Sequence, residues 1–265
     1  MKFLILGENG MLGSQLMKTL SKNHLVIGTS SEKGYRVNSP NDIEKFDTLI
    51  KEFKPNAVIN CIGIIKQKES TPEQQVLINS LLPKLLSNVC AKHGSKLVHV
   101  STDCVFDGKV GNYTKRDITN AQDLYGMTKA VGELDNYNRP LTIRTSIIGH
   151  EKDSKYGLLE WFLHSEGKVS GYSNVWYSGI TTLELAKFID KFWTFSGLLQ
   201  IAGPKINKYE LLNIIKKVYN KDIIIEKNED VVLDRSMKTS FKLYKSPTWE
   251  EMIQELREDH NEISS

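Results

Sequence analysis

The chain has 265 residues, a formal net charge of +3 at pH 7 and charged residues at 25% of its positions. This composition excludes a disordered or fibrous protein, and the length is enough to bury a sizeable core. The charge is too small for a nucleic-acid partner, no run approaches the roughly 18 apolar residues of a membrane span, and no signal peptide is recognisable. Cys61, Cys90 and Cys104 form no CxxC pair, so neither a disulfide scaffold nor a metal site is expected. We therefore expect a cytoplasmic protein that binds neither nucleic acid nor membrane.

Short β-branched runs alternate with helical repeats along the first 150 residues. Strands are predicted at 2–6, 24–28, 57–61, 96–101 and 141–145. Leucines at every fourth position from residue 12 to residue 20 predict the first helix. Capping sequences at Ser39 and Thr71 start two more helices, and another begins near Tyr125. This alternation predicts an α/β protein with a Rossmann fold, a doubly wound parallel sheet whose ligands bind at the carboxyl ends of the strands.

The pattern changes after residue 150. Residues 167–179 are rich in Gly, Ser, Tyr and Trp and are interpreted as a loop. A capped helix starts after Thr181, a short strand follows at 198–202, and further helices start after Asn207 and Thr248. The domain assignment that follows is residues 1–150 and about 180–203 for the Rossmann domain, about 151–179 and 204–258 for a small C-terminal substrate-binding lobe, and 259–265 for a polar tail.

The segment GENGMLG (7–13) joins the first predicted strand to the first predicted helix, with the spacing GxxGxxG. Glycines at these positions allow a tight turn, a close approach of the backbone to a pyrophosphate, and close packing of the helix on the sheet. The helix N-terminus adds amide donors for phosphate. The turn therefore predicts a dinucleotide cofactor held by Gly7, Asn9, Gly10, Met11, Leu12 and Gly13.

The residues after the second strand bear on which dinucleotide binds. Thr29, Ser30, Ser31 and Lys33 suit the 2′-phosphate of NADPH, whereas Glu32 would favour NADH if it faced the ribose. We expect NADPH, with NADH as the alternative. Further cofactor contacts are expected at Asn38, Cys61, Ile62, Gly63 and Ser101.

Tyr125 and Lys129 are four residues apart, so they share one face of a helix. The pair carries little information by itself, and its weight comes from the segment VSTD (100–103) at the end of an earlier strand. Reduction of a ketone by hydride creates an alkoxide, which needs a proton donor. Tyr125 can supply the proton if nearby Lys129 lowers its pKa, and Thr102 can donate a hydrogen bond to the carbonyl oxygen. The catalytic residues predicted for such a reductase are Thr102, Tyr125 and Lys129.

Five segments carry a family resemblance, in this order: GENGMLG (7–13), NCIG (60–63), VSTDCVFDG (100–108), YGMTKAVGE (125–133) and IRTSIIG (143–149). Together they resemble an extended short-chain dehydrogenase/reductase, and more narrowly the dTDP-4-dehydrorhamnose reductase group of nucleotide-sugar reductases. The resemblance implies hydride transfer to C4 of a 4-keto-6-deoxy sugar by Thr102, Tyr125 and Lys129, with Lys129 also binding the nicotinamide ribose. It places Asn79 beside the cofactor as support for the water network of the catalytic lysine; the alternative is a buried Asn that satisfies backbone groups.

The expected sugar pocket departs from the rhamnose reductase pattern. Cys104 stands where Tyr is common, Lys115 where Glu is common, and Ile147-Ile148 replaces an aromatic pair. The segments 60–67 and 178–186 look more like relatives that act on UDP-linked 2-acetamido-2,6-dideoxy-4-keto-hexoses. We therefore expect a UDP-2-acetamido-2,6-dideoxy-4-hexulose as substrate, in the biosynthesis of surface polysaccharide sugars. The expected substrate contacts are Lys66, Asp103, Cys104, Ser146, Asn174, Trp176 and Arg235, of which Arg235 and Lys66 are candidates for the diphosphate.

Other functions stay open at this stage. One is a dTDP-4-dehydrorhamnose reductase, and another is a nucleotide-sugar epimerase; a dehydratase is disfavoured because no Glu follows Asp103. The last is a non-catalytic, NADP-binding regulatory subunit, since the regulatory β subunit of methionine adenosyltransferase retains this fold and cofactor site. The sequence leaves open whether the protein is a monomer or a homodimer.

Overall fold

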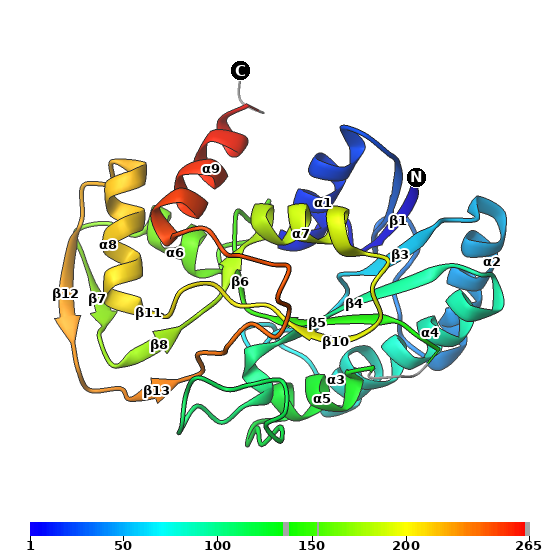
Figure 1. Ribbon diagram of the computed structural model, residues 1–265, viewed down its shortest axis with the longest axis horizontal. Helices are drawn as coiled ribbons and strands as arrows, with labels where there is room; N and C mark the ends of the chain where they lie inside the picture. The colour runs from blue at the N-terminus through cyan, green and yellow to red at the C-terminus, as the bar shows by residue number, and fades with distance from the viewer. Residues whose placement is uncertain (135–137, 153, 263–265) are drawn as a thin grey trace.

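A parallel sheet of six strands lies at the centre of the protein (Figure 1), seen here in a computed structural model that describes residues 1–134, 138–152 and 154–262. The strands are β1 (Lys2–Leu6), β2 (Leu25–Thr29), β3 (Ala57–Asn60), β4 (Lys96–Thr102), β5 (Leu141–Thr145) and β10 (Gly197–Gln200). Their order is β10-β5-β4-β3-β1-β2, and every neighbouring pair is parallel. The topological switch point therefore lies between β1 and β3, and the predicted Rossmann class is confirmed.

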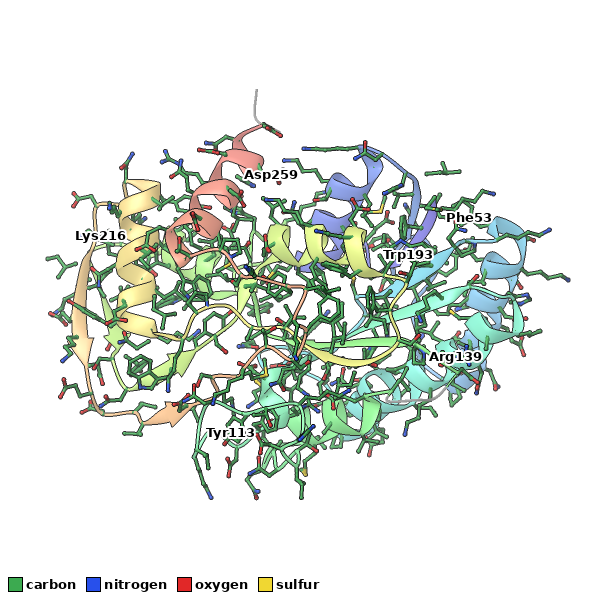
Figure 2. The ribbon with its side chains drawn as sticks, viewed as in Figure 1. Phe53, Tyr113, Arg139, Trp193, Lys216 and Asp259 are labelled. Carbon is green, nitrogen blue, oxygen red and sulfur yellow. The ribbon has the colours of Figure 1, made fainter. Side chains whose placement is uncertain are left out.

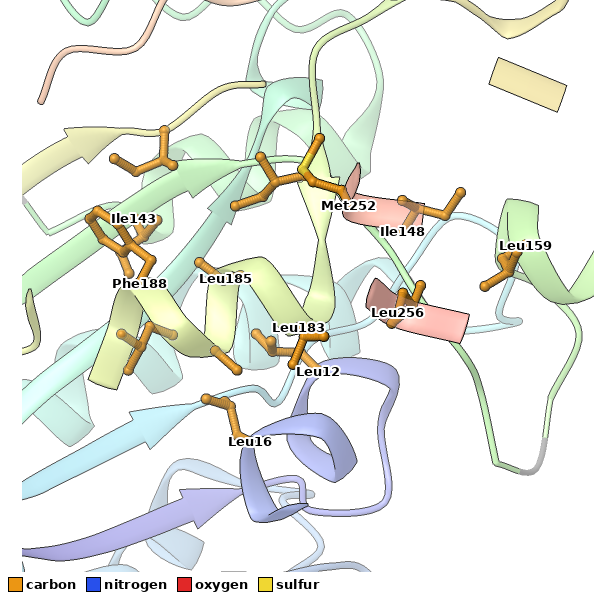
Figure 3. Close-up of a cluster of buried hydrophobic side chains, with 14 of the residues drawn as sticks. Leu12, Leu16, Ile143, Ile148, Leu159, Leu183, Leu185, Phe188, Met252 and Leu256 are labelled. Atoms are coloured by element: carbon orange, nitrogen blue, oxygen red, sulfur yellow. The ribbon is translucent and has the colours of Figure 1, made fainter. Parts of the chain in front are cut away.

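The strands are apolar on both faces because helices cover both faces of the sheet. In β1, Phe3 and Ile5 belong to one buried core, whereas Leu4 and Leu6 belong to a second core on the opposite face. The covering helices are α1 (Met11–Ser21) and α7 (Thr182–Phe192) on the first core, and α2 (Ile43–Phe53) and α4 (Leu82–Lys92) on the second. Figure 3 shows the first core, where leucines of α1 and α7 meet side chains of the sheet and of the second lobe.

The long helix predicted after Thr71 contains a wide turn in its middle. It forms as α3 (Pro72–Gln75), the π-helical turn η2 (Val76–Leu81) and then α4. Pro83 accounts for the wide turn, because it has no N–H to donate to the carbonyl of Asn79, four residues earlier. An alanine Cβ at Gly132, the last residue of α5 (Leu124–Gly132), would lie 1.9 Å from that same carbonyl oxygen. The glycine thus lets α5, which carries the Tyr125 and Lys129 pair, pack closely against the turn.

The elements after β5 that lie outside the central sheet and α7 are called the second lobe. Its helices are α6 (Leu158–His164), α8 (Lys208–Tyr219) and α9 (Trp249–Asn261). Its small sheets are β7 (Lys168–Tyr172) with β12 (Ile224–Asn228), and β8 (Val175–Tyr177) between β11 (Ile206–Asn207) and β13 (Leu233–Asp234). Two short strands, β6 (Ile147–Ile148) and β9 (Ile180–Thr181), pair where the chain leaves the central sheet and returns to it. The prediction of a loop over 167–179 is therefore wrong, because β7 and β8 are too short for their alternation to stand out in the sequence.

Helix α9 attaches the second lobe to the Rossmann domain. Its Met252 and Leu256 are buried in the same core as the leucines of α1 (Figure 3). Near its end, Asp259 forms an ion pair with Lys18 of α1 at 3.0 Å and accepts a hydrogen bond from Gln15 at 2.9 Å (Figure 2). These contacts hold the last turn of the helix in place, so the polar tail predicted from residue 259 is wrong as far as Asn261. Residues 263–265 lie outside the described chain.

Candidate active site

A cavity of about 790 Å³ opens at the carboxyl ends of β1, β3, β4 and β5, where ligands bind in a doubly wound sheet. It is lined on one side by the strand ends and α5, and on the other by residues of the second lobe. A neighbouring hollow of about 540 Å³ shares Asn9, Gly10 and Cys61 with this cavity and reaches the loop after β2. The two hollows adjoin at the glycine turn and together offer room for a dinucleotide and a second ligand.

The glycine turn brings the first helix unusually close to the first strand. Gly7 has a positive φ of 84°, and its N–H donates to the carbonyl of Thr29 at 3.0 Å. An alanine Cβ at Gly13 would lie 2.0 Å from the Gly7 carbonyl oxygen, so only glycine fits there. Gly10 provides the N-cap of α1 without a side-chain hydrogen bond, and Met11 and Leu12 follow it along the cavity wall. The first amides of α1 therefore have no side-chain cap, and such amides are typical donors to phosphate.

The loop after β2 places a different cation in the adjoining hollow from the one expected. Lys33 lies 2.6 Å from Oε1 of Glu8, and its side chain does not line the hollow. Arg36, which the sequence analysis passed over, lines it instead. Glu32 accepts a hydrogen bond from Asn9 at 3.1 Å, which lowers its freedom to bind a ribose hydroxyl. The remaining expected contacts in this loop, Ser30, Ser31 and Asn38, line the hollow, whereas Thr29 does not.

Thr102 at the end of β4 and Tyr125 near the start of α5 both line the cavity. The hydroxyl of Thr102 donates to Oδ1 of Asp103 at 3.1 Å and accepts from the N–H of Cys104 at 3.1 Å, in the short helix η3 (Asp103–Val105). An alanine Cβ at Gly126 would lie 2.2 Å from the Cys104 carbonyl oxygen, so this glycine lets the start of α5 approach η3. The approach places Tyr125 in the same cavity wall as Thr102 and Cys104.

The protonation of Tyr125 differs from the expectation drawn from the sequence. Burial raises the pKa of the phenol well above its ordinary value, nearby Cys104 and Asp103 raise it further, and Thr102 opposes them only in part. Lys129 is buried too, which lowers its pKa to about 8, and its ammonium donates to the carbonyl of Val100 at 2.8 Å. The prediction that Lys129 lowers the Tyr125 pKa is therefore wrong for the site without ligands, and the phenol keeps its proton.

A buried ion pair joins the end of α5 to β5. Glu133 follows α5 and binds Arg144 of β5 through both of its oxygens, at 2.8 and 2.6 Å. Ser101 lines the cavity, but its hydroxyl donates to Glu133 at 2.7 Å. The carboxylate also raises the pKa of Lys129 against the effect of burial. This network therefore connects β4, β5 and the end of α5 close to Lys129.

Asn79 lies on the π-helical turn and has its polar atoms committed to the protein. Its Oδ1 accepts from the N–H of Ile64 at 2.9 Å, and its Nδ2 donates to the Ile64 carbonyl at 3.0 Å and to the Thr128 hydroxyl at 3.3 Å. The side chain is buried and lines neither hollow. Asn79 therefore holds the loop that follows β3, where Cys61, Ile62 and Gly63 line both hollows.

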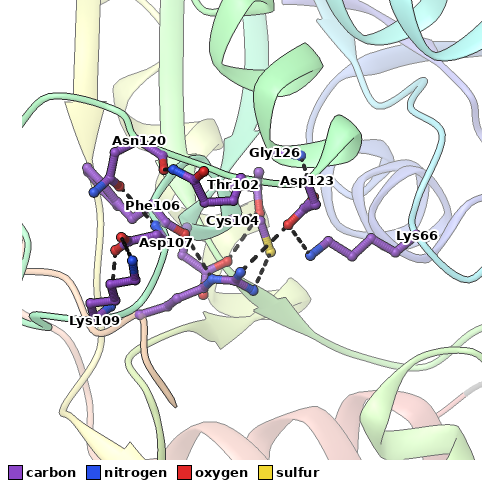
Figure 4. A network of polar contacts seen from close by, with 12 residues as sticks. Lys66, Thr102, Cys104, Phe106, Asp107, Lys109, Asn120, Asp123 and Gly126 are labelled. Carbon is purple, nitrogen blue, oxygen red and sulfur yellow. Dashed lines mark hydrogen bonds and ion pairs between the residues drawn. The ribbon is translucent and has the colours of Figure 1, made fainter. Parts of the chain in front are cut away.

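Asp123 is the carboxylate that faces both Lys66 and Arg235 (Figure 4). Its Oδ1 caps α5 by accepting the N–H of Gly126 at 2.9 Å, and its Oδ2 lies 2.6 Å from the ammonium of Lys66. The same oxygen is 3.8 Å from Arg235, whose guanidinium also donates to the Phe106 carbonyl at 2.9 Å. Lys66 and Arg235 thus reach the cavity, but both already face a carboxylate.

The second lobe contributes one wall of the cavity. Two of the expected substrate contacts, Ser146 and Trp176, line the cavity, whereas Asn174 does not and donates to the Glu229 carbonyl at 3.1 Å. Lys208, the first residue of α8, was missed by the sequence analysis and also lines the cavity. Burial lowers the pKa of Lys208 to about 8, opposed by the charges of Asp103 and Cys104.

Residues 1–134, 138–152 and 154–262 contain no candidate metal site and no candidate membrane-spanning helix. No three His, Cys, Asp or Glu side chains of this part of the chain are grouped so that they could hold a metal ion. No helix in it combines the length and the apolar character needed to cross a membrane.

Residues 1–161 match the family model described as the RmlD substrate binding domain. Over 140 residues the chain is 34% identical to a dTDP-4-dehydrorhamnose reductase of Aggregatibacter actinomycetemcomitans, covering 50% of this chain and 45% of that protein. Over 154 residues it is 34% identical to methionine adenosyltransferase 2 subunit beta of Xenopus laevis, covering 55% and 46%. The chain thus spans about half the length of these curated relatives. A crystal structure of dTDP-4-dehydrorhamnose reductase from Bacillus anthracis, in complex with NADP, has a TM-score of 0.83 at 20% identity over 97% of this chain and 99% of that one.

Proposed function

Because the chain belongs to the RmlD substrate binding domain family, we propose that it is an NADPH-dependent reductase that acts on the C4 ketone of a nucleotide-linked 4-keto-6-deoxyhexose. The observation that carries the proposal is that Thr102, Tyr125 and buried Lys129 line one cavity, together with residues of the glycine turn. The relative that is named a dTDP-4-dehydrorhamnose reductase supports the same chemistry.

The residues of the glycine turn and of the loop after β2 fit NADPH. The α1 N-terminus has free amides for the pyrophosphate, and Arg36 in the adjoining hollow offers a guanidinium fork to a 2′-phosphate. NADPH, when bound, supplies a hydride. We expect Lys129 to hold the nicotinamide ribose, because its ammonium is buried at the end of the cavity where Cys61 also lies.

The chain itself supplies the proton and orients the ketone. When the ketone carbon gains a hydride, its oxygen becomes an alkoxide, and Tyr125 donates its phenolic proton to that oxygen. The raised pKa of Tyr125 keeps the proton on the phenol until the alkoxide forms. Thr102 donates a hydrogen bond to the same oxygen once substrate replaces its bond to Asp103. The resulting tyrosinate takes a proton from solvent before the next turnover.

The sugar we favour is a UDP-2-acetamido-2,6-dideoxy-4-hexulose, used for surface polysaccharide sugars. Cys104 lines the cavity beside Tyr125, and its small side chain leaves more room there than the Tyr common in rhamnose reductases. An acetamido group at C2 would use that room. dTDP-4-dehydrorhamnose is the competing substrate, and the named reductase relative supports it equally.

The test is a panel of UDP- and dTDP-linked 4-keto-6-deoxy sugars, assayed by NADPH oxidation with NMR of the product. We expect turnover that falls by about 10²–10⁴-fold in Tyr125→Phe, with NADPH affinity retained. Tyr172→Phe is the matched control, because Tyr172 lies exposed in β7 and lines neither hollow. No turnover with any sugar, or an unchanged rate in Tyr125→Phe, would overturn the proposal.

A non-catalytic, NADP-binding subunit is the second candidate, favoured by the match to methionine adenosyltransferase 2 subunit beta. The presence of Thr102, Tyr125 and Lys129 in one cavity weighs against it. A stable stoichiometric complex with another enzyme, together with no reductase activity, would support this candidate. An epimerase would instead retain oxidised cofactor through purification and consume no NADPH.

A further inference from the structure

Lys208 brings a positive charge to the cavity from the second lobe. Its Nζ atom lies 4.0 Å from the centre of the Tyr177 ring, and both residues line the cavity. The residue is partly buried, and its side chain borders the cavity. Among the residues that the structure describes, no carboxylate forms an ion pair with Lys208 and no acceptor takes a hydrogen bond from its ammonium. The three donors of this group are therefore unused.

A cation at a cavity wall that has no carboxylate or acceptor from the protein favours an anion in the cavity. The face of the Tyr177 ring attracts the cation but accepts no ordinary hydrogen bond. Asp103 is the carboxylate whose charge acts on Lys208, yet its Oδ1 already accepts the Thr102 hydroxyl. The position of Lys208 is thus better explained by an anionic ligand in the cavity than by contacts within the protein.

The start of α8 adds to the positive potential at this place. Asn207 caps the helix by accepting the N–H of Glu210 at 2.8 Å, which satisfies only one of the first amides. The helix has 12 residues, so its N-terminus carries the positive end of a substantial dipole. The Lys208 ammonium and this dipole act in the same direction on an anion.

Lys68 and Lys152 also line the cavity, but three of its other cations are already engaged. Lys129 donates to the Val100 carbonyl beside the catalytic residues. Arg235 donates to the Phe106 carbonyl and faces Asp123, and Lys66 is paired with the same carboxylate at 2.6 Å. The two residues that the sequence favours for the diphosphate are therefore less free to bind it than Lys208.

We propose that Lys208 binds the diphosphate that links the sugar to its nucleoside, an inference that rests on the proposed reductase function. The sugar ketone must lie at Tyr125 and Thr102, and the rest of the substrate must continue along the same cavity toward Trp176 and Lys208. Phosphate oxygens accept the hydrogen bonds that the ammonium leaves unused, and they bring the negative charge that it lacks. The contribution of Lys208 is therefore to substrate affinity and to the position of the sugar.

The test compares the binding of UDP, dTDP, UMP and uridine to the protein saturated with NADP⁺, by calorimetry. We expect Lys208→Met to weaken UDP and dTDP binding by about 10- to 100-fold, the effect of losing one hydrogen bond to a charged group, with uridine unaffected. Lys217→Met is the matched control, because Lys217 lies exposed near the other end of the same helix. Methionine has a similar size to the lysine stem and carries no charge. A melting curve of Lys208→Met checks that the variant folds.

Equal UDP affinity in the wild-type protein and Lys208→Met would overturn the inference. An equal loss of UDP and uridine binding would also overturn it, because the lysine would then stabilise the lobe and not bind the diphosphate. The binding assay needs no turnover, so it also separates this inference from the proposed function. A UDP affinity that depends on Lys208, in a protein that reduces no sugar, would leave the diphosphate site standing without the reductase. Turnover with a KM that Lys208→Met leaves unchanged would leave the reductase standing without this site.

Discussion

Replacing Glu133 with Gln tests the role of the buried ion pair between Glu133 and Arg144, near Lys129. The carboxylate of Glu133 binds Arg144 through two hydrogen bonds and accepts a third from Ser101 at 2.7 Å. The side chains of Glu133 and Arg144 are only 9% and 3% exposed, so solvent cannot take over the role of the carboxylate. Glutamine keeps the shape but removes the charge, and the Arg144 guanidinium stays buried without its counter-ion.

Two effects of known direction follow from Glu133→Gln. Breaking a buried ion pair by removing one partner costs about 3–5 kcal/mol in the free energy of unfolding. For a chain of this size, each kcal/mol lowers Tm by about 2–4 °C, so we expect a fall of about 6–20 °C. The charge of Glu133 also raises the pKa of Lys129, which burial lowers to about 8. Without that charge the pKa of Lys129 falls, and Lys129 loses its proton at a lower pH.

Thermal melts and pH profiles of kcat/KM measure both effects. Glu255→Gln is the control, because Glu255 and Lys187 form an ion pair at 2.7 Å in which both side chains are nearly half exposed. Such a pair contributes about 0–1 kcal/mol, so Tm should fall by no more than about 4 °C. In Glu133→Gln the alkaline limb of the activity profile should move to lower pH. Equal changes of Tm in the two variants, or an alkaline limb that does not move, would refute this view of the buried network.

Gly13→Ala should lower Tm by several degrees, because a Cβ 2.0 Å from a carbonyl oxygen forces α1 away from the sheet at a cost of about 1–3 kcal/mol. In Gly10→Ala the Cβ makes an ordinary 3.4 Å contact, so Tm should not change, whereas NADPH affinity should fall. Equal melting temperatures for the two variants would contradict this. Burial and a neighbouring histidine lower the pKa of His260, so the unfolded chain takes up a proton more readily below about pH 6.5, and stability should fall from pH 7 to pH 5. His260→Phe should flatten that slope in melts across this range, and an unchanged slope would count against it. Arg36→Ala should reduce the ratio of kcat/KM for NADPH to that for NADH by about tenfold or more, because the guanidinium lines the hollow next to the glycine turn; an unchanged ratio would remove Arg36 from the cofactor site.

Local signals in the sequence were enough to predict the central sheet and to single out Thr102, Tyr125 and Lys129, which line one cavity. The glycine spacing, the capping sequences and the strand runs each depend on neighbours a few residues apart, and so does the Tyr125 and Lys129 pair. The π-helical turn at Asn79 was not predicted, because it follows from Pro83 and from the packing of Gly132 against a carbonyl. Asp123 had a usable signal, an Asp directly before a helix, which was overlooked.

The remaining errors concern contacts between distant segments. Lys33 looked suited to a 2′-phosphate until folding placed Glu8 at 2.6 Å from it, and nothing near Arg36 in the sequence indicates that it lines the hollow instead. Likewise, Lys208 is one of several lysines in α8, and only the fold brings it over the Tyr177 ring. Burial is also set by the whole fold, which is why the direction of the Tyr125 pKa shift was wrong.

The most direct measurement is transfer of deuterium from NADPH labelled at C4 of the nicotinamide to a nucleotide-linked 4-keto-6-deoxy sugar. Hydride transfer with Tyr125 as proton donor predicts one deuterium at C4 of the sugar, with a single configuration, and about 10²–10⁴-fold slower incorporation in Tyr125→Phe. Mass spectrometry and NMR of the product read both the label and its position. A product without deuterium at C4, or equal incorporation rates in the wild-type protein and Tyr125→Phe, would contradict the proposed reaction.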